Sequence, residues 1–227
     1  MVSKQPDSRA DQLEDDIRNQ LAASGLIPLG WFETDGSSAL LIGNIGSSFW
    51  PAFSGSNEHL DGNPDPLNRW TTSMVTQLVA SLPEGCVSDV RYPFGEPIWP
   101  FQQYARQALG VEQSPLGLLI HPEYGLWFAF RAALVFATDG VGPKPRSAML
   151  NHPCDSCVEK PCLNTCPIGA FTVEAYDYPA CKSHVGSEAG RTCFSGGCLA
   201  RQACPVGQDY ANVKPHQAFH MRAMFDP

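Results

Sequence analysis

Apolar residues recur at helical spacing in three segments of the first 110 residues. In segment 8–25, Leu13, Ile17 and Leu21 lie four residues apart and Gly25 follows, which predicts an amphipathic helix that ends there. A second helix is predicted at 65–82, opened by Asp-Pro, and a third at 98–110. The predicted buried face of the second helix carries Leu67, Trp70, Met74 and Leu78.

Short apolar runs bounded by turn residues predict strands between these helices. They are LIPLGWFE (26–33) and ALLIGNIG (39–46). Two further β-rich runs flank a His-Pro-Glu-Tyr-Gly turn within residues 115–140 and predict a central hairpin. Residues 46–66 are rich in Gly, Ser, Asn and Pro, which predicts a long loop and a candidate binding loop. Helices and strands together indicate an α+β domain over residues 1–140.

Composition and charge narrow the class of protein. The chain has 227 residues and a net charge of -8, with 7 Lys/Arg against 16 Asp/Glu in residues 1–140 and 8 against 7 in residues 141–227. Neither part has the basic stripe that neutralises phosphates, so no nucleic-acid partner is expected. No apolar run approaches the roughly 20 residues that span a bilayer, and the start is too polar for a signal peptide. We therefore expect no membrane partner, and a cytoplasmic protein whose thiols stay reduced.

Cysteines dominate the chain after a predicted Gly/Pro linker at residues 141–150. The spacing is C-x2-C-x4-C-x3-C-P followed by C-x11-C-x4-C-x5-C-P, so each half ends in Cys-Pro. Four converging thiolates hold a 4Fe-4S cluster, and in two-cluster ferredoxins the Cys before Pro binds the other cluster. Residues 151–227 therefore predict a ferredoxin-like domain with two 4Fe-4S clusters. The alternatives are one cluster, zinc bound by cysteines, or disulfides. The predicted ligands are Cys154, Cys157, Cys162 and Cys204 for one cluster, and Cys166, Cys181, Cys193 and Cys198 for the other.

The segment GLLIHPEYGLWFAFRAALVF (117–136) resembles the motif of the cobalamin type C trafficking family, which removes the upper ligand of cobalamin. The matching residues are Ile120, His121, Pro122, Gly125, Trp127, Phe128, Ala129 and Arg131. The resemblance implies a nitroreductase-like α+β fold that binds cobalamin with its lower base detached. It also implies removal of the upper ligand by reduction or by transfer to glutathione.

The cysteine-rich region separately resembles the ferredoxin part of epoxyqueuosine reductase and of reductive dehalogenases. Those proteins couple a cobalamin-binding domain of related fold to two 4Fe-4S clusters. The two resemblances together imply an oxidoreductase that takes electrons from an external donor and passes them to the cobalt of cobalamin. The cobalamin would be either the substrate or the cofactor for a small-molecule substrate. Transfer RNA is a disfavoured substrate because the chain lacks a basic surface.

Five residues are candidates for contact with the cofactor. Arg131 matches an arginine that the cobalamin family uses towards glutathione, although it could equally be an ion-pair partner. His121 is a candidate hydrogen-bonding residue or plain turn chemistry, and Trp127 is a candidate for either ligand or core. Trp50 and Phe53 lie in the predicted loop, where stacking on a planar cofactor would explain their aromatic rings. No catalytic residue is assigned.

Two other functions remain open at this stage. The nitroreductase-like fold commonly hosts FMN, so an FMN-dependent iron-sulfur reductase is one alternative. A plain ferredoxin-type electron carrier without an active site is the other.

Overall fold

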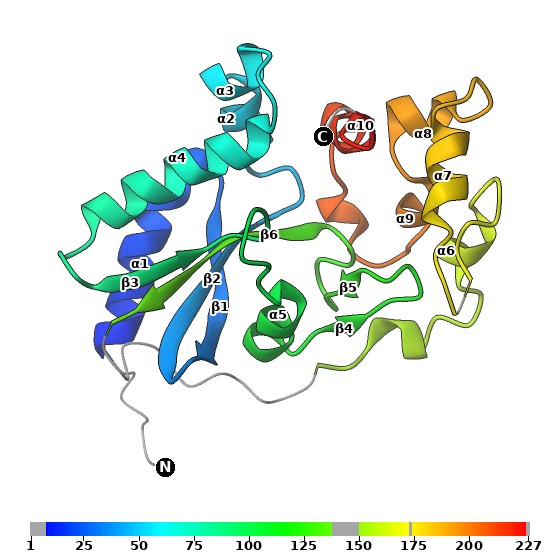
Figure 1. Ribbon diagram of the computed structural model, residues 1–227. Coiled ribbons are helices and arrows are strands. Elements are labelled where there is room, and N and C mark those ends of the chain that lie inside the picture. Colours follow the sequence, from blue (N-terminus) through cyan, green and yellow to red (C-terminus); the bar gives the residue numbers. More distant parts are fainter. Residues whose placement is uncertain (1–7, 138–149, 173, 226–227) are drawn as a thin grey trace. The chain divides into compact units, whose positions relative to one another are not determined.

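The computed structural model describes residues 8–137, 150–172 and 174–225, so the predicted linker lies outside this part except for Leu150 (Figure 1). The architecture is mixed α+β, as predicted. The described residues form two compact units. Unit 1 contains residues 8–44, 48–110 and 129–137, and unit 2 contains the rest. Residues 111–128, which the prediction assigned to the first domain, belong to unit 2.

Unit 1 is built on a four-stranded sheet in the order β1-β2-β6-β3. The strands are β1 (Ile27–Thr34), β2 (Ser37–Ile45), β3 (Val87–Arg91) and β6 (Phe128–Phe136). β1 pairs antiparallel with β2, and β3 with β6. Asp35 and Gly36 join β1 to β2, and both have positive φ, 51° and 76°. Asp-Gly is a preferred sequence for such a two-residue turn, so this hairpin is encoded locally.

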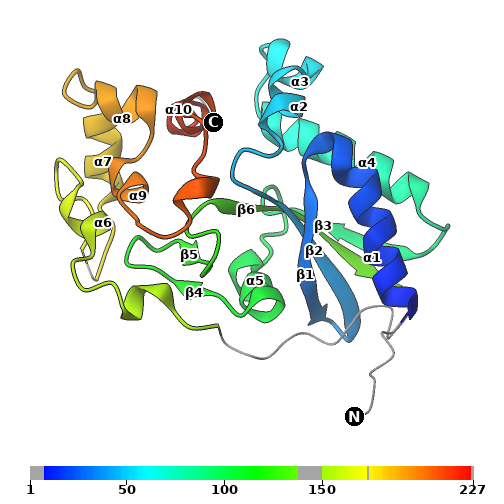
Figure 2. The same ribbon diagram turned by 180° about the vertical axis from the view of Figure 1, so that it is seen from behind.

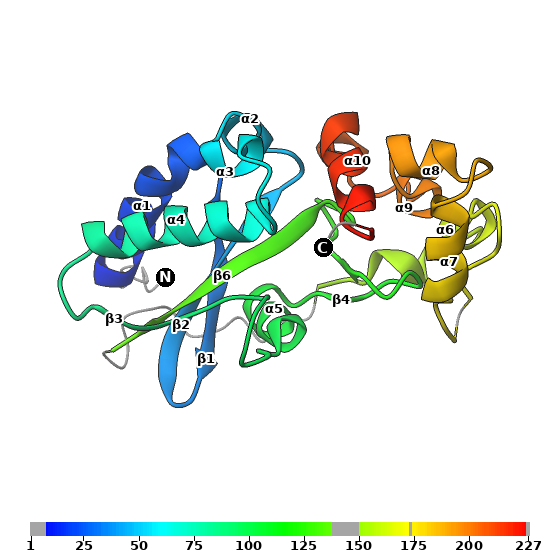
Figure 3. The same ribbon diagram turned by 45° about the horizontal axis from the view of Figure 1, so that its top comes forward.

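Three long helices cover the two faces of this sheet (Figure 3). They are α1 (Ser8–Leu21) and α4 (Pro66–Ser81) on one face and α5 (Phe101–Leu109) on the other. Successive side chains of β1 point to opposite faces. Accordingly, Trp31 donates a 2.8 Å hydrogen bond to Glu14 of α1, whereas the Phe32 ring stacks at 4.4 Å on Tyr104 of α5. All three predicted helices are confirmed.

The buried face of α4 differs from the prediction at one position. Leu67, Trp70 and Leu78 are buried as expected, but Val75 is fully buried while Met74 is only half-buried. A strict four-residue step drifts around a helix of 3.6 residues per turn, and this drift accounts for the change.

The predicted long loop at 46–66 contains two short helices, α2 (Trp50–Ser54) and α3 (Asn57–Leu60), so the loop prediction was wrong there. Pro51 lies in the first turn of α2, and the Ser56 hydroxyl caps α3 by accepting from the amide of His59 at 3.3 Å. Phe53 is fully buried against Phe49 and Trp70. These aromatic contacts hold the helices in place.

The predicted central hairpin was also wrong. β5 (Leu119–Ile120) pairs with β4 (Glu112–Gln113), and β6 joins the four-stranded sheet instead. The turn from β4 to β5 has Pro115 at its second position and Gly117 (φ +75°) at its fourth, and the Gly117 amide donates to Ser114 at 2.9 Å. This is standard β-turn chemistry, and it gives β5 a partner before the chain reaches β6.

Unit 2 is mostly helical beyond the β4–β5 hairpin, and Figure 2 shows α6 to α9 gathered beside that hairpin. Its elements are η2 (Pro153–Asp155), α6 (Pro161–Asn164), α7 (Tyr178–Val185), α8 (Arg191–Gly196), α9 (Leu199–Gln202), η3 (Gln208–Tyr210) and α10 (Lys214–Arg222). After residue 150, the only strand pairing among the described residues is an isolated bridge between Phe171 and Tyr176. The described residues after 150 therefore do not form a separate ferredoxin domain, and they share their unit with 45–47 and 111–128. In the described chain, no helix combines the length and the apolar character that crossing a membrane requires.

Candidate functional site

Four cysteines of unit 2 lie close enough to influence one another's charge, and we call them set A: Cys154, Cys157, Cys162 and Cys204. Burial raises the pKa of the Cys154 thiol to about 11, and the neighbouring Cys204, Cys162 and Cys157 raise it further, while Lys160 opposes them. Burial also raises the pKa values of Cys162 and Cys204. Cys204 and Cys157 add to the effect on Cys162, and Cys157 adds to the effect on Cys204. The four thiols of set A thus lie close together although Cys204 is 42 residues after Cys162 in the sequence.

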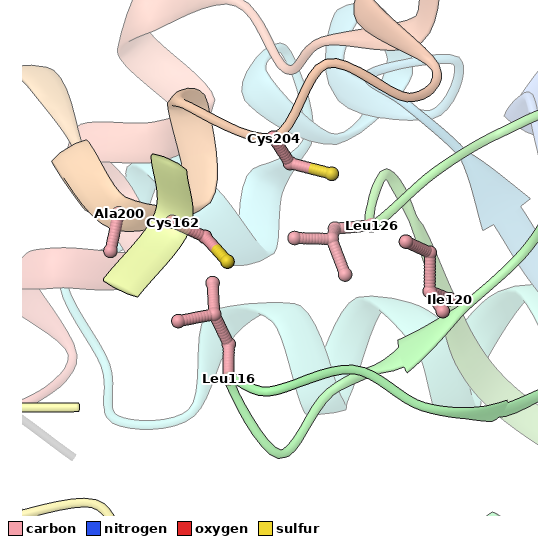
Figure 4. Close-up of a cluster of buried hydrophobic side chains, with 6 residues drawn as sticks. All are labelled: Leu116, Ile120, Leu126, Cys162, Ala200 and Cys204. Atoms are coloured by element: carbon pink, nitrogen blue, oxygen red, sulfur yellow. The ribbon is translucent and has the colours of Figure 1, made fainter. Parts of the chain in front are cut away.

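A small cavity of about 20 Å³ lies between the set A side chains. The sulfur atoms of Cys162 and Cys204 point into this space towards Leu116 and Leu126, as Figure 4 shows. All four cysteines line it together with residues of the β4–β5 turn and of the Cys-Pro-Val segment 204–206. The lining is thus mostly apolar side chains and thiols.

The other four cysteines form set B: Cys166, Cys181, Cys193 and Cys198. Burial raises the pKa of the Cys193 thiol, and the charges of Cys166 and Cys181 add to that effect. Burial also raises the pKa of the Cys198 thiol, and the charges of Cys181 and Cys193 add to that effect. The sequence analysis proposes the same grouping for two clusters, with the Cys before each Pro joined to the other half, and the binding of a cluster by either set stays a prediction. Cys86 belongs to neither set.

In residues 8–137, 150–172 and 174–225, no three His, Cys, Asp or Glu side chains are placed so that they could hold a single metal ion. A closed zinc site brings all four ligands within about 2.0–2.3 Å of one ion. The described arrangement therefore differs from a closed zinc site. None of the nine cysteines forms a disulfide in the described chain.

The His-Pro-Glu-Tyr-Gly turn packs against the segment that follows Cys204. A side chain at Gly207 (φ +71°) would put its Cβ 2.3 Å from the backbone of Tyr124, so these two backbones touch. The Tyr210 hydroxyl also donates a 2.7 Å hydrogen bond to Glu123. The turn that matches the cobalamin family motif therefore positions the fourth cysteine of set A.

His121 and Trp127 are both held inside this part of unit 2. The His121 Nδ1 atom accepts from the amides of Glu123 (3.1 Å) and Tyr124 (3.3 Å), and the two rings of His121 and Tyr124 stack at 4.2 Å. Burial lowers the pKa of His121, and Glu123 partly opposes this. Trp127 is 1% exposed and lies 4.6 Å under the guanidinium carbon of Arg201. His121 thus makes turn contacts, which is one of the two roles that the sequence analysis gave for it.

Arg201 is a half-buried arginine beside set B that the sequence analysis missed. It donates a 2.5 Å hydrogen bond to the carbonyl of Leu126, and its Nε atom is buried with no hydrogen-bond partner among the described residues. Burial lowers its pKa to about 10, while the nearby Cys198 opposes that shift. No carboxylate of the described residues forms an ion pair with it. An arginine shielded from water normally has a negatively charged partner, and the cysteines of set B are the nearest candidates. The sequence alone could not show that Arg201 lies near these cysteines.

Arg131 occupies a comparable position in unit 1. Its Nε atom donates a 3.0 Å hydrogen bond to the side-chain oxygen of Asn44, and its guanidinium carbon lies 4.8 Å from the centre of the Phe49 ring. Burial lowers its pKa to about 10, and within the described part of the chain it has no carboxylate partner. The sequence analysis gave an ion pair as one possible role of Arg131, and no described carboxylate forms that ion pair.

Trp50 and Phe53 belong to an aromatic group in unit 1. Phe53 is fully buried, and its ring lies 5.7 Å from that of Trp50 and 4.8 Å from that of His59. Trp50 is half-buried. The structure brings Phe53 into the core and leaves part of Trp50 accessible.

The fold defines the class of protein before any relative is considered: an α+β protein with a central antiparallel-paired sheet and a cysteine-bearing helical unit. No protein-family model matches the chain, and no curated protein matches its sequence. Among solved structures, the chain is similar to the crystal structure of a C. elegans B12-trafficking protein CblC, a human MMACHC homologue. The TM-score is 0.57 at 16% sequence identity, over 96% of this chain and 93% of that one. The two proteins therefore share a fold.

Proposed function

We propose that the chain binds cobalamin and delivers single electrons from an external donor to its cobalt through two 4Fe-4S clusters held by sets A and B. The observation that carries the proposal is that the four cysteines of set A line one cavity, while those of set B lie close enough to influence one another's charge. The fold shared with a B12-trafficking protein supports the cobalamin part.

The donor chemistry of each set fits a four-iron cluster. Thiolates are the usual ligands of iron-sulfur clusters, and in a four-iron cluster each thiolate binds a different iron. The four sulfurs then surround a larger centre than one ion, and in set A all four cysteines face one cavity. When bound, the clusters supply one-electron transfer at low potential.

The uncompensated charge of Arg201 is a second observation in favour of a cluster at set B. Four thiolates and a four-iron core carry net negative charge, which would stabilise a buried guanidinium that has no carboxylate nearby. Neutral thiols would leave that cation without compensation. The proposed cluster therefore explains a feature that an empty set of thiols does not.

Arg131, Asn44 and Phe49 are the residues of unit 1 that we propose to contact the cofactor. The guanidinium group is desolvated, and the rest of its donors have no acidic partner in the described chain. Amide and phosphate oxygens at the edge of a corrin are acceptors of the kind that arginine binds. His121 and Trp127 then act on the cofactor indirectly, by holding the turn next to Cys204.

The proposal is tested by anaerobic purification with iron and sulfide analysis, followed by titration with cobalamin in its Co(II) state. We expect about eight irons and eight sulfides per chain, as two four-iron clusters require. We also expect the corrin spectrum to shift to the form with the lower base detached. Addition of a one-electron donor to the loaded protein should then reduce the bound cobalt faster than it reduces free cobalamin.

Three results would contradict the proposal or part of it. A chain that cannot be loaded with iron would remove the electron-transfer role. Eight irons without any change in the corrin spectrum would remove cobalamin, and a bound yellow chromophore after reconstitution with FMN would replace it with a flavin. Iron without binding of either cofactor would reduce the function to that of an electron carrier.

A further inference from the structure

We propose that His216 and His220 of α10 form a binding site for one divalent transition-metal ion, and that Ser47 positions the His216 ring. All three residues lie in unit 2, and none of them belongs to set A or set B. The site therefore goes beyond the proposed function and does not depend on it. Water completes the coordination of the ion.

The two histidines lie on one face of a helix. They are four residues apart in α10 (Lys214–Arg222). Side chains at this spacing project from the same face, one turn apart. Two histidines four residues apart on one helical face are a known arrangement of zinc ligands. The spacing alone is common in helices, so the placement of the two rings is the stronger observation.

Both rings present the same nitrogen to each other. The Nε2 atoms of His216 and His220 lie 2.9 Å apart, and the ring centres lie 4.8 Å apart with an angle of 49° between the ring planes. Two imidazole nitrogens that bind one ion at about 2.1 Å, at an angle between a right angle and a tetrahedral angle, lie roughly 3.0–3.4 Å apart. The observed distance is just below that range. An ion bound to both atoms therefore requires only a small rotation of the rings.

Ser47 fixes the orientation of the His216 ring. Its hydroxyl oxygen lies 2.8 Å from His216 Nδ1, and it accepts a 2.9 Å hydrogen bond from the amide of Val213, next to the start of α10. A histidine that binds a metal through Nε2 almost always donates its Nδ1 hydrogen to an acceptor that fixes the ring. Ser47 can be such an acceptor, because the Val213 amide holds its oxygen in place.

The histidine pair is shielded at one residue and accessible at the other. His216 is 1% exposed, whereas His220 is half-buried, so water can reach the pair from the His220 side. Contacts that do not involve the histidines hold α10 beside α8 (Figure 3). The Gln217 side chain donates a 2.6 Å hydrogen bond to the carbonyl of Asn212, and a Cβ at Gly197 would collide with Gln217. The backbone that carries both rings is therefore fixed before an ion binds.

The two imidazoles select the class of ion. Imidazole nitrogen suits Zn²⁺, Ni²⁺, Cu²⁺ and Fe²⁺, whereas Mg²⁺ and Ca²⁺ prefer oxygen ligands. In the part of the chain that the structure describes, no third His, Cys, Asp or Glu is placed to complete the site. The ion therefore keeps several positions for water or for a small ligand, unlike an ion in a closed structural site.

The test is a calorimetric titration of the reconstituted full chain with Ni²⁺. The chain must carry no polyhistidine tag, because a tag would bind the same ion. Ni²⁺ is preferred to Zn²⁺ because thiolates are favoured ligands of Zn²⁺. We expect the unmodified chain to bind one Ni²⁺ without the charge-transfer absorption of nickel-thiolate bonds. That absorption would report binding at cysteines.

His220→Gln removes one of the two ligands at a half-buried position. It should weaken Ni²⁺ binding by more than about a hundredfold, the upper end of the range for loss of an orienting partner. His184→Gln is the matched control, because His184 is also half-buried in unit 2 but lies on α7, and it should keep the full affinity. His216→Gln tests the other ligand. If this variant fails to fold because the ring is buried, His220→Gln still tests the site.

Ser47→Ala separates positioning from ligation, because it leaves both imidazoles in place. It should weaken Ni²⁺ binding by roughly tenfold. Ser47→Thr keeps the hydroxyl group and should restore most of the affinity. Equal loss in both variants would show that the hydroxyl does not position His216.

The inference and the proposed function fail in different ways. Equal Ni²⁺ affinity in the unmodified chain and in folded His220→Gln would overturn the inference and leave the two rings as a hydrogen-bonded pair. Nickel bound only with thiolate absorption would overturn it as well. A chain without iron would overturn the proposed function alone, because the difference between His220→Gln and His184→Gln would remain.

Discussion

A Cβ atom at Gly125 would lie 2.0 Å from the carbonyl oxygen of Val206, two residues beyond Cys204. The turn of the β-rich segment and the last cysteine segment therefore approach through bare backbone. Gly125 also has φ +57°, which side-chain-bearing residues rarely adopt. The position thus requires glycine for two reasons, and a larger residue would displace the backbone next to Cys204 of set A.

We predict that Gly125→Ala destabilises the protein and impairs loading of set A. The added methyl group must displace the 206–207 backbone, which should cost about 1–3 kcal/mol beyond the strain of a positive φ. Gly117→Ala is the matched control, since Gly117 has φ +75° but nothing within 4 Å of its added Cβ. Urea unfolding and iron content measure both effects. Equal losses in the two variants would show that the close approach to Val206 does not matter.

Replacing one cysteine of a set should remove one cluster and leave the other. For Cys166→Ala we expect iron to fall from about eight to about four per chain, together with loss of any cobalt reduction that depends on set B. Cys86→Ala is the control, because Cys86 belongs to neither set, and it should keep its full iron content. Loss of all iron from Cys166→Ala, in a protein that remains folded, would contradict two independent clusters.

Arg131→Met separates a binding role from a structural one. Removing a desolvated cation that has no acidic partner in the described residues, together with its hydrogen bond to Asn44, should change the free energy of unfolding by less than about 1.5 kcal/mol. Loss of a charged hydrogen bond to the cofactor should weaken cobalamin binding by about 1.5–3 kcal/mol. Arg18→Met, on the exposed surface of α1, is the control for loss of one positive charge. Lower stability with unchanged affinity would make Arg131 a structural residue.

The pKa of His121 predicts a pH dependence of stability. Burial lowers the folded-state pKa below the unfolded value of about 6.5, so the unfolded chain binds more protons between those two values. Stability should therefore fall as the pH drops below about 6.5 and level off below the folded pKa. Urea unfolding between pH 5 and 7.5 measures this.

His121→Asn isolates that contribution from the other histidines. Asparagine keeps an oxygen that can accept from the Glu123 and Tyr124 amides, but it does not titrate. The variant should show a shallower loss of stability on acidification than the unmodified chain. Parallel pH profiles for the two proteins would exclude His121 as the source.

Much of the local structure was predictable because it depends on neighbours in the sequence. The helical spacing of Ile17 and Leu21, the Asp-Pro start of α4 and the short apolar run of β1 each depend on a few adjacent residues, and all three elements are confirmed. Spacing and the two Cys-Pro pairs also led to the proposed grouping of the cysteines, and the binding of a cluster by either set stays a prediction.

Strand pairing and short helices could not be predicted in the same way. The β-rich run around His121 offered two strands of suitable length, but the Pro115-containing turn pairs β5 with β4, and a long-range pairing takes β6 into the other sheet. Helices α2 and α3 are too short to show a period, and aromatic contacts with Trp70 stabilise them.

The chain's own pattern was sufficient for the three long helices of unit 1 and for strands β1 and β2, since each depends on residue types close together in the sequence. Folding alone placed Arg201 and Tyr176 beside set B, and it also brought Gly125 against Val206. These residues lie on separate segments, and burial and proximity give them their charge environment. Such effects arise only when distant parts of the chain exclude water together.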